Sequence, residues 1–526
     1  MTIIVVPVDG ATNIKLEALD FDSLTTVFSL VTDSPTTEVD GRVYNSSEDE
    51  CAWYDECIRK LPGQQRSVRV IAPVARGASG GLIGGDNTLI EVPGKGLTLS
   101  YTQEYSPQVE DAFRSLAGTD EKFYCETGSI LSFPGSMTLL KRFVFEEHER
   151  PELVERAAYF GTYGIVLSGH FLGGDYLRAA RLAGNEHGYW MCHSGSRNIN
   201  KQPGTPSSAA RTIPSFNALV PHLPARVYVP LGRMPEWKAS SLGINGDLLV
   251  IPGGHDTCMS HIPVMTACYR SLGTSPDLPI LHIDAGSWTM IARIGGQLDL
   301  PPDGYKRGIM VQGTVDGEPV VTSIYGGGND FRYLQVLSEQ RIGGFGGNRA
   351  DERLLLETAS AADCFALPNI NPMNHNTGPF PGVKGRIVNE PAFFESPVKA
   401  YTVANLTTAL VTVFQIELMA GNELSPVILT AGGAKDPLYG RLIATLTGRT
   451  VYALFDRNGN ALTETTTLGA AIAGKAAFLG IHPYMVDMAA LETTFRELPP
   501  FRVEIGNALR RYRERFMCEL KRASAS

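Results

Sequence analysis

Gly-Gly-His-Asp-Thr, residues 253–257, follows the apolar run Leu-Leu-Val-Ile of residues 248–251 after a single proline. The apolar run predicts a β-strand, and the two glycines predict a tight turn at its end. Glycine lets the backbone bend sharply, so the acid on this turn, Asp256, is able to approach a substrate closely. Most turns of this kind only end a strand, and the meaning of this one depends on similar turns elsewhere in the chain.

Three further glycine-rich turns occur at intervals along the sequence. They are Asp-Gly-Ala-Thr-Asn at residues 9–13, Ala-Gly-Ser-Trp-Thr at 285–289 and Ala-Gly-Gly-Ala-Lys-Asp-Pro at 431–437. Phosphoryl transfer requires backbone N–H groups that hold phosphates, a divalent cation and a base beside the acceptor hydroxyl. The glycine turns are suited to the first task, and Asp256 is suited to accept the hydroxyl proton. The four turns together predict a sugar kinase.

Composition and charge set the class of protein. The chain has 526 residues, which is too long for one typical hydrophobic core and predicts two large domains. Its 43% apolar and 19% charged content is that of an ordinary globular protein. The net charge of -9 and the lack of a sustained basic tract argue against nucleic acid as a partner. The basic residues between 510 and 522 alternate with apolar ones and predict the solvated face of a terminal helix.

The cysteines and the apolar segments bear on the compartment. The eight cysteines form no Cys-x-x-Cys pair and are expected to be reduced, structural thiols. Residues 3–8 are too short for a signal peptide, and no apolar run reaches about 18 residues. We therefore expect a cytoplasmic protein that neither is exported nor binds a membrane.

The pattern of strands and helices suggests a repeated α/β unit. Residues 3–8 and 14–22 predict a β-hairpin, with Pro7 at an edge position or a bulge. Further predictions are a strand at 68–72, a helix at 151–159 and a surface excursion at 181–216. A second cycle is predicted as a helix at 257–272, strands at 281–283 and 290–293, a helix at 400–421 in a cleft or core, a strand at 427–429 and a helix at 437–447. This pseudo-repeat predicts two α/β domains, residues 1–258 and 259–526, that face one cleft.

The order and spacing of these motifs resemble the FGGY carbohydrate kinases, and most closely their rhamnulokinase and fuculokinase branch. Residues 9–15 resemble the first phosphate hairpin of that family, 254–257 its His-Asp turn, and 286–288 its Gly-Thr-Trp. Residues 432–438 resemble its Gly-Gly-x-x-Asn adenosine motif, followed by Thr-Gly-Arg at 447–449 and Glu-Thr-Thr-Thr-Leu-Gly-Ala-Ala at 464–471. The resemblance implies an α/β fold of two ribonuclease H-like (actin-like ATPase) domains around a central cleft.

The resemblance also implies roles for individual residues. Asp256 would be the catalytic base, the N-terminal domain would bind sugar and phosphate, and the C-terminal domain would bind the nucleotide. The implied nucleotide-binding residues are Gly10, Thr12, Asn13, Gly286, Ser287, Gly432, Gly433 and Asp436. The implied substrate-binding residues are Trp53, Arg76, Ser79, Gln103, Glu104 and Asp256. Trp53 is equally consistent with a packing residue and Glu104 with a surface acid. The implied cofactors are ATP and Mg²⁺, the implied partners are a sugar and ATP, and the implied assembly is a homodimer.

Two positions depart from the family pattern. The family has a magnesium-binding aspartate two residues before the hairpin glycine, where this chain has Val8, and the nearest acid is Asp9. A shift of one residue along a strand turns a side chain to the opposite face. Either a bulge near Pro7 restores the geometry, with Asp9 as the metal ligand, or metal handling is altered. Arg76 is the second departure, and it suggests either an acceptor that carries a carboxylate or a site no longer used for a standard ketose.

Three functions follow as alternatives. The first is an ATP-dependent kinase that phosphorylates a hydroxyl of a ketose or related sugar, with domain closure that excludes water. The second is a catalytically weak sugar- or nucleotide-binding protein derived from such a kinase. The two differ in whether ADP appears when sugar is added. The third, an actin-like filament protein or chaperone ATPase, is disfavoured because the chain has no long lid domain and has the His-Asp turn of sugar kinases.

Overall fold

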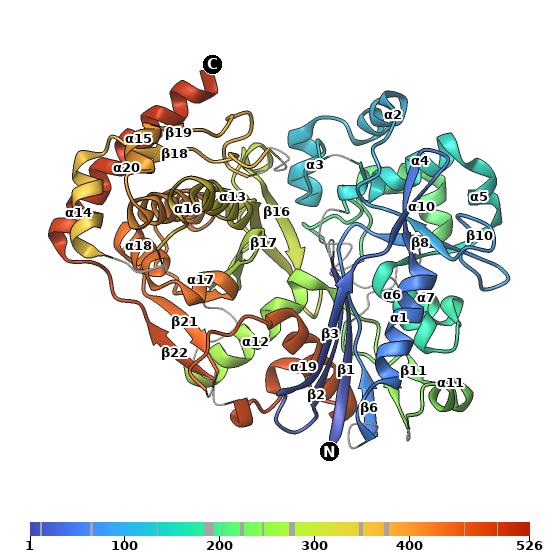
Figure 1. The fold of residues 1–526 in the computed structure, drawn as a ribbon. Helices are drawn as coiled ribbons and strands as arrows, with labels where there is room; N and C mark the ends of the chain where they lie inside the picture. The colour runs from blue at the N-terminus through green and yellow to red at the C-terminus, as the bar shows by residue number, and fades with distance from the viewer. Residues whose placement is uncertain are drawn as a thin grey trace. The chain divides into compact units, whose positions relative to one another are not determined.

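The computed structural model describes the chain apart from residues 11–12, 64–66, 134, 184–193, 202–203, 221–225, 245–246, 273–278, 347–350, 373–377, 457, 492 and 526. The chain forms two compact units (Figure 1). Unit 1 contains Met1–Gly273, Met310–Val320 and Glu464–Glu492, and unit 2 contains Thr274–Ile309, Val321–Thr463 and Thr493–Ser526. Each unit is therefore built from separated segments, whereas the sequence pattern suggests two continuous halves that meet at residue 258.

Unit 1 is built on a mixed sheet in the order β11-β12-β6-β1-β2-β3, and β7 joins β1 to β13. These strands are β1 (Thr2–Asp9), β2 (Asn13–Asp20), β3 (Thr26–Asp33), β6 (Ser67–Ile71), β7 (Val74–Ala75), β11 (Gly232–Arg233), β12 (Leu249–Val250) and β13 (Gly254–His255). β1, β2 and β3 form an antiparallel meander, while β6 with β7 and β12 with β13 continue the sheet as two interrupted parallel strands.

Helices cover both faces of this sheet. On one face, Ile3 and Val5 of β1 pack in a core with Tyr54 of α1 (Ser47–Arg59) and Ile165 of α6 (Tyr163–Phe171). On the other face lie α12 (Asp256–Ser271) and α19 (Thr465–Leu479), where Gly474 approaches Ile4 closely. Although α19 comes late in the chain, it packs against β1 (Figure 1).

A second apolar cluster of unit 1 lies around helices α2, α4 and α10 and a small sheet of β4, β5 and β9, while other elements, such as α7 and α11, add to the first core. The remaining described elements of unit 1 are β4 (Thr36–Val39), β5 (Arg42–Ser46), β8 (Gly80–Gly84), β9 (Leu97–Leu99), α2 (Pro107–Ala117), α3 (Asp120–Thr127), η2 (Gly135–Met137), α4 (Leu140–Glu149), α5 (Pro151–Arg156), β10 (Ala157–Thr162), α7 (Tyr176–Ala183), α9 (Ser208–Thr212), α10 (Pro214–Leu219), α11 (Glu236–Ser241), η4 (Pro483–Met485) and η5 (Ala489–Leu491).

Unit 2 is built on a second mixed sheet in the order β16-β17-β15-β14-β20-β21-β22. The middle of the β16–β17 hairpin, residues 310–320, belongs to unit 1. The elements are β14 (Ile280–Ala285), β15 (Thr289–Ile294), η3 (Gly304–Arg307), β16 (Ile309–Gly313), β17 (Pro319–Tyr325), α13 (Gly327–Ile342), α14 (Glu352–Ala361), β18 (Phe365–Ala366), β19 (Ile387–Val388), α15 (Glu390–Phe393), α16 (Pro397–Ala420), β20 (Val427–Thr430), α17 (Ala431–Lys435), α18 (Pro437–Thr447), β21 (Val451–Phe455), β22 (Thr494–Glu497) and α20 (Val503–Ala525).

The two sheets repeat one topology. In unit 2, β14, β15 and β17 are antiparallel neighbours, and β20 and β21 continue the sheet as parallel strands beside β14. This is the arrangement of β1, β2 and β3 with the parallel strands β6–β7 and β12–β13 in unit 1. A glycine turn joins the first two strands of each meander. The structure thus confirms the α/β class and the repeated strand–turn–strand unit predicted from the sequence.

Several local predictions differ from the structure. Pro7 lies inside the sheet rather than at an edge, and the β1–β2 register runs unbroken past it. Pro7 is tolerated because it lies between two paired stretches of β1. The pairing with β6 ends at Val5, and the pairing with β7 begins at Val8. The helix predicted at 151–159 ends at Arg156, because the following residues form β10 against β8. The excursion at 181–216 is not a purely surface segment, since residues such as Ser194 and Ala210 are buried.

By length and composition alone, α16 is able to cross a membrane, but 78% of its apolar 18-residue window is buried inside the protein. Its side chains pack in the core of unit 2 with those of α18 and α20. From the sequence, no apolar stretch of this length is expected. α16 departs from that expectation, and its burial identifies it as a core helix. All seven described cysteines are free thiols, and Cys192 lies outside the described residues.

Candidate active site

Three strand ends bring the predicted site residues of unit 1 together. In the sheet register Asp9 of β1 is the partner of Ala75 of β7, and Ala75 is the partner of His255 of β13. Asp9, Arg76 and Asp256 therefore lie together at the carboxyl ends of three neighbouring parallel strands. The carboxyl ends of parallel strands are the usual place for ligand binding in α/β folds.

Asp256 is the first residue of α12, and one of its two carboxylate oxygens is fixed. Oδ1 accepts hydrogen bonds from the backbone N–H of Thr257 at 2.6 Å and from its hydroxyl at 3.2 Å, and it lies 3.2 Å from Nε2 of His255. Oδ2 has no partner among the described residues. The side chain is 45% exposed, so Oδ2 is open to a ligand. One oxygen thus orients the carboxylate and the other is available to accept a proton.

His255 supports Asp256 from a buried position. Burial lowers the pKa of His255, although the Asp256 charge acts against this, so the imidazole is neutral at pH 7. A neutral ring that donates from Nε2 to Asp256 leaves Nδ1 as an acceptor, and the Cys258 Sγ lies 3.8 Å from Nδ1. Gly77 is required beside this ring, because a Cβ there would lie 2.4 Å from Nε2. His255 is accordingly a hydrogen-bonding residue that helps to orient Asp256.

Arg76 and Asp9 form a buried ion pair at the same strand ends. Nε of Arg76 donates to Oδ2 of Asp9 at 2.8 Å, and Nη2 donates to Oδ1 of Asp9 and, at 3.0 Å, to the hydroxyl of Ser34. The guanidinium also lies over the ring of Tyr163, with 5.7 Å between Cζ and the ring centroid. Burial alone would lower the pKa of Arg76, but the Asp9 carboxylate raises it above its usual value.

Asp9 does not fit the role of magnesium ligand that the sequence gives it. Its side chain is fully buried, and both oxygens are bound to Arg76. Mg²⁺ requires near-octahedral oxygen ligands and usually keeps several waters, for which a buried carboxylate bound by a guanidinium leaves no room. The unbroken register past Pro7 also excludes the bulge that would have restored the family geometry. Among the described residues, no cluster of three or more acidic, histidine or cysteine side chains is arranged to bind a metal ion.

Glu50 of α1 extends this buried cluster. Its two oxygens accept hydrogen bonds from the hydroxyls of Tyr54 at 3.0 Å and Tyr163 at 2.7 Å. Burial raises the pKa of Glu50 to about 8, and the Asp9 charge adds to this effect, while Arg76 and the two hydroxyls oppose it. Glu50 is therefore mainly protonated at pH 7, behind the Arg76 and Asp9 pair.

The protonation of Glu50 predicts a pH dependence of stability. Its ordinary pKa is 4.5, so between that value and about 8 the folded protein holds a proton that the unfolded chain releases. Stability contributed by Glu50 is therefore complete below pH 4.5 and is lost as the pH rises toward 8. We expect Glu50→Gln to remove this loss, which is on the order of a few kcal/mol because one pKa unit corresponds to about 1.4 kcal/mol.

Urea unfolding near about pH 5 and about pH 9 checks this expectation. The wild type should lose more of its free energy of unfolding over this interval than the Gln variant. Glu38→Gln, a change at an exposed acid of β4, is the matched control and should follow the wild type. Equal pH dependence in wild type and Glu50→Gln would contradict the assignment.

In unit 2, the C-terminal glycine turns line one pocket of about 150 Å³. Gly286, Gly432, Gly433 and Asp436 all belong to its wall. The full lining is Ala285, Gly286, Thr289, Gly328, Phe331, Asn405, Thr408, Gly432, Gly433, Asp436 and Tyr439. Two turns that are about 150 residues apart in sequence thus meet because β14 and β20 are parallel neighbours. Ser287 is exposed on the same turn as Gly286, and its carbonyl accepts the N–H of Asn329 at 2.9 Å.

Close packing explains the glycines of this pocket. A Cβ on Gly433 would lie 2.9 Å from the Cβ of Ala285, and one on Gly328 would lie 2.0 Å from the carbonyl oxygen of Gly286. Gly328 belongs to the Gly-Gly-Gly run at 326–328, which precedes and begins α13. The Gly286 turn and the Gly433 turn therefore approach each other across a gap too narrow for side chains.

Asp436 caps α18 at the edge of this pocket. Its Oδ1 accepts the N–H of Leu438 at 2.9 Å, and its Oδ2 accepts the hydroxyl of Tyr401 at 2.6 Å. Burial raises the pKa of Asp436, although these hydrogen bonds oppose the shift. A carboxylate held in this way faces a ligand as a hydrogen-bond acceptor, suited to a ribose hydroxyl or an amino group.

The other residues expected at the site lie in different surroundings. Gly10 and Asn13 close the β1–β2 turn through the bond from Gly10 N–H to Asn13 O, and Thr12 lies outside the described residues. Trp53 is half-buried against the core of unit 1, as a packing residue would be. Gln103 accepts the N–H of Val43 at 2.9 Å and donates to the carbonyl of Glu104.

Ser79 and Glu104 differ in exposure. Ser79 is buried, and its hydroxyl has no hydrogen-bond partner among the described residues. Glu104 is exposed. Their roles in binding stay predictions.

Sequence reasoning missed several residues at these sites. The hydroxyl of Tyr101 experiences the charges of Arg76, Asp256 and Asp9, which places it beside the strand ends. Tyr101 stands two residues before Gln103, the position chosen from the sequence. Glu50 and Tyr163 come from helices, and Asn405 and Phe331 come from α16 and α13. No local motif marks them, since each reaches its site only through the packing of distant segments.

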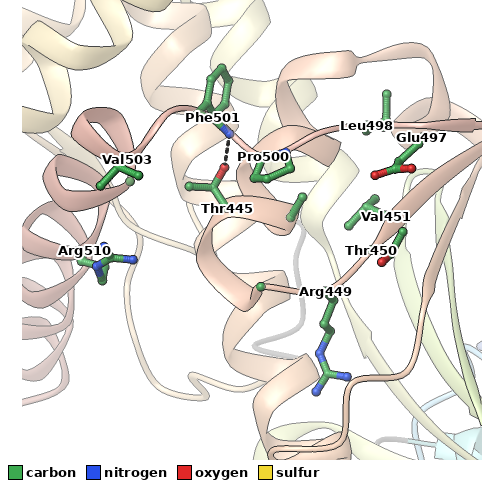
Figure 2. A pocket seen from close by; sticks show the side chains of 13 residues that line it. Thr445, Arg449, Thr450, Val451, Glu497, Leu498, Pro500, Phe501, Val503 and Arg510 are labelled. Carbon is green, nitrogen blue, oxygen red and sulfur yellow. Dashed lines mark hydrogen bonds between the residues drawn. The ribbon is translucent and has the colours of Figure 1, made fainter.

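A larger cavity of about 360 Å³ lies elsewhere in unit 2 (Figure 2). It is bordered by the end of α18, by β21 and β22, and by the start of α20. None of the residues predicted for the site lines it. Figure 2 shows that the N–H of Phe501 bonds to Thr445 at this cavity.

Comparison with known proteins finds a family match for the C-terminal part of the chain. Residues 279–478 match the model of the carbohydrate kinase FGGY, C-terminal domain. No curated protein sequence matches the chain at a significant level.

Similar folds occur among solved structures. A carbohydrate kinase from Novosphingobium aromaticivorans is 20% identical, with a TM-score of 0.76 over 99% of this chain and 98% of that one. A xylulose kinase from Lactobacillus acidophilus is 14% identical, with a TM-score of 0.72 over 100% and 99% of the two chains. A gluconate kinase from the same species is 15% identical, with a TM-score of 0.72 over 100% and 98%.

The domain match and the structural likeness agree with the repeated α/β topology described above. The neighbours are kinases of xylulose and gluconate, so they do not support the rhamnulokinase and fuculokinase branch in particular. Residues 279–478 match the C-terminal domain of the FGGY carbohydrate kinases, and the whole chain has the fold of the carbohydrate kinase structures to which it is similar.

Proposed function

We propose that the protein is an ATP-dependent carbohydrate kinase, a phosphotransferase that transfers the terminal phosphate of ATP to a hydroxyl of a ketose or related sugar. The observation that carries this proposal is the state of Asp256. Its Oδ1 is fixed by Thr257 and His255, while Oδ2 is open at the strand ends. A carboxylate with one oriented, unoccupied oxygen is suited to remove the proton of an acceptor hydroxyl during in-line transfer.

The nucleotide pocket of unit 2 supports the same function. Backbone atoms of the Gly286 and Gly433 turns form its wall, and Phe331 and Tyr439 offer aromatic surface to a base. In this proposal ATP binds there through its adenosine, with Asp436 as an acceptor for a donor group of the nucleoside. The Gly10–Asn13 turn and the Gly286–Ser287 turn would bind phosphates. Mg²⁺ is proposed as the companion of ATP, held by groups other than Asp9.

The acceptor is proposed to bind in unit 1 beside Arg76, Ser79, Tyr101 and Asp256. Arg76 and Ser79 are predicted from the sequence, and Tyr101 is added because the charges of Arg76, Asp256 and Asp9 act on its hydroxyl. Trp53, Gln103 and Glu104 have less support, because Trp53 packs in the core and Gln103 bonds to the backbone. We further propose a cytoplasmic homodimer that acts on small molecules, with neither nucleic acid nor membrane as a partner.

One observation favours a second candidate, a catalytically weak sugar- or nucleotide-binding protein. Where the family resemblance implies an acid for magnesium, this chain has Val8, and Asp9 is bound to Arg76. A kinase that lacks this acid would bind its ligands and turn over slowly.

A coupled ADP-release assay with Mg²⁺ and ATP tests the proposal. The acceptors are L-rhamnulose, L-fuculose, L-ribulose, D-xylulose, alditols, glycerol and D-gluconate. ADP release that depends on one of them is the expected result. ATP binding without acceptor-dependent ADP release across the panel would favour the second candidate.

A further inference from the structure

The guanidinium of Arg76 is immobilised at the strand ends of unit 1. Two hydrogen bonds join it to Asp9, one joins it to Ser34, and it lies over the ring of Tyr163. Tyr163 is in turn bound to Glu50 at 2.7 Å. Because these contacts already fix the Arg76 side chain, it loses little conformational entropy when it binds a ligand.

The bonds to protein groups leave part of the guanidinium unused. Nε has one N–H and bonds to Asp9, while both N–H groups of Nη2 are taken by Asp9 and Ser34. Nη1, with its two N–H groups, has no partner among the described residues. Arginine has five such donors in a rigid plane, so two remain in a fixed direction.

The net charge around Arg76 determines which kind of ligand group Nη1 binds most favourably. The Asp9 carboxylate compensates the Arg76 charge at hydrogen-bond distance, so the pair as a whole is neutral. The nearby Asp256 carboxylate then leaves the strand ends with a net negative charge. Such surroundings favour a neutral hydroxyl or carbonyl oxygen over a carboxylate as the partner of Nη1. A preference for a neutral ligand group is the opposite of one sequence-based expectation, in which Arg76 indicates an acceptor that carries a carboxylate.

We propose that Asp9 is a positioning residue, not a magnesium ligand, and that it holds Arg76 as a charge-compensated hydrogen-bond donor to a neutral acceptor. The inference rests on the proposed function, because it assumes that the acceptor binds at these strand ends. It assigns to Asp9 a task that the family resemblance does not imply, and it narrows the acceptor class to uncharged sugars and polyols.

The first test concerns magnesium and uses binding alone. Isothermal titration calorimetry measures the affinity for ADP with EDTA and with saturating Mg²⁺, in the wild type, in Asp9→Asn and in the control Glu38→Gln. The ratio of the two affinities should agree in all three proteins within about threefold. A ratio that falls at least about tenfold in Asp9→Asn alone would show that Asp9 binds the metal ion and would overturn the proposal.

The second test concerns the acceptor. The wild type should bind D-xylulose or xylitol more tightly than D-gluconate. Asp9→Asn leaves the Arg76 charge uncompensated, so the affinity ratio of gluconate to the neutral ligand should rise at least about tenfold. A wild type that prefers gluconate, or an unchanged ratio in the variant, would overturn the proposal. A protein with only a structural Asp9 would lose affinity for both ligands alike.

A third variant guards against loss of folding. Asp9→Asn combined with Arg76→Gln removes both charges and leaves no unpaired charge in the interior. It should keep the magnesium ratio of the wild type and show weaker binding of the neutral ligand. Failure of the proposed function has a different signature, because the wild type would then release no ADP with any acceptor. The magnesium ratio would still decide the role of Asp9.

Discussion

Replacing Asp256 with asparagine is expected to lower kcat by about 10²–10⁴-fold, the usual contribution of a general base. Asparagine has nearly the same shape and keeps an oxygen for the hydrogen bonds from Thr257, but it cannot accept the acceptor proton. The side chain is 45% exposed and lies outside the core, so the variant should fold with little loss of stability. Affinities for ATP and for the acceptor should change by less than about threefold.

Steady-state kinetics of ADP release, with calorimetry for both ligands, measures this result. Asp299→Asn, the same change at an exposed acid of unit 2, is the matched control and should keep the activity of the wild type. If Asp256→Asn kept near-full turnover, another group would be the base. If it instead lost acceptor binding with little change in kcat, Asp256 would bind the sugar without taking its proton.

Gly433→Val is expected to weaken ATP and ADP binding by about 100-fold or more. The pocket of unit 2 has a volume of only about 150 Å³, and a Cβ at this position would already lie 2.9 Å from Ala285. A valine would therefore occupy the space proposed for the base. About 0.3 kcal/mol per atom over the roughly ten heavy atoms of a purine gives a loss of about 3 kcal/mol, which is about 100-fold in affinity.

Calorimetric titration with ADP checks this effect, and acceptor binding should persist because it is assigned to unit 1. Gly85→Val is the control, since a Cβ at Gly85 meets nothing within 4 Å. Unchanged ADP affinity in Gly433→Val would show that the adenosine binds elsewhere. The larger cavity shown in Figure 2 would then be the next candidate.

Glycine turns were the part of the site that local sequence could predict. The run Ala-Gly-Gly-Ala-Lys-Asp-Pro at 431–437 combines glycines for a close approach with a helix-capping aspartate. The strand β20 ends just before the run, α17 lies within it, and α18 begins at its last residue. The apolar runs before the turns at 253 and 286 likewise predicted strands that the structure contains. Local periodicity and turn chemistry are enough for such units.

Contacts between distant segments were beyond this reasoning. Whether Asp9 faces Mg²⁺ or Arg76 depends on which sheet face it occupies and on what the turn after β7 places opposite it. The acid of α1 that ends up beside this pair, Glu50, stands in a run of polar residues without a distinctive pattern. The early end of the helix predicted at 151–159 has the same origin, because pairing of β10 with β8 overrides the helical pattern after Arg156.

The central claim is that this chain transfers a phosphoryl group from ATP to a sugar hydroxyl. Phosphorus NMR of a reaction with ATP, Mg²⁺ and the acceptor found in the ADP-release assay tests it most directly. The account predicts one phosphomonoester of the sugar for each ADP formed in the wild type, and neither product above background with Asp256→Asn. ADP and inorganic phosphate without a sugar phosphate, or no ADP from a wild type that binds ATP, would contradict it.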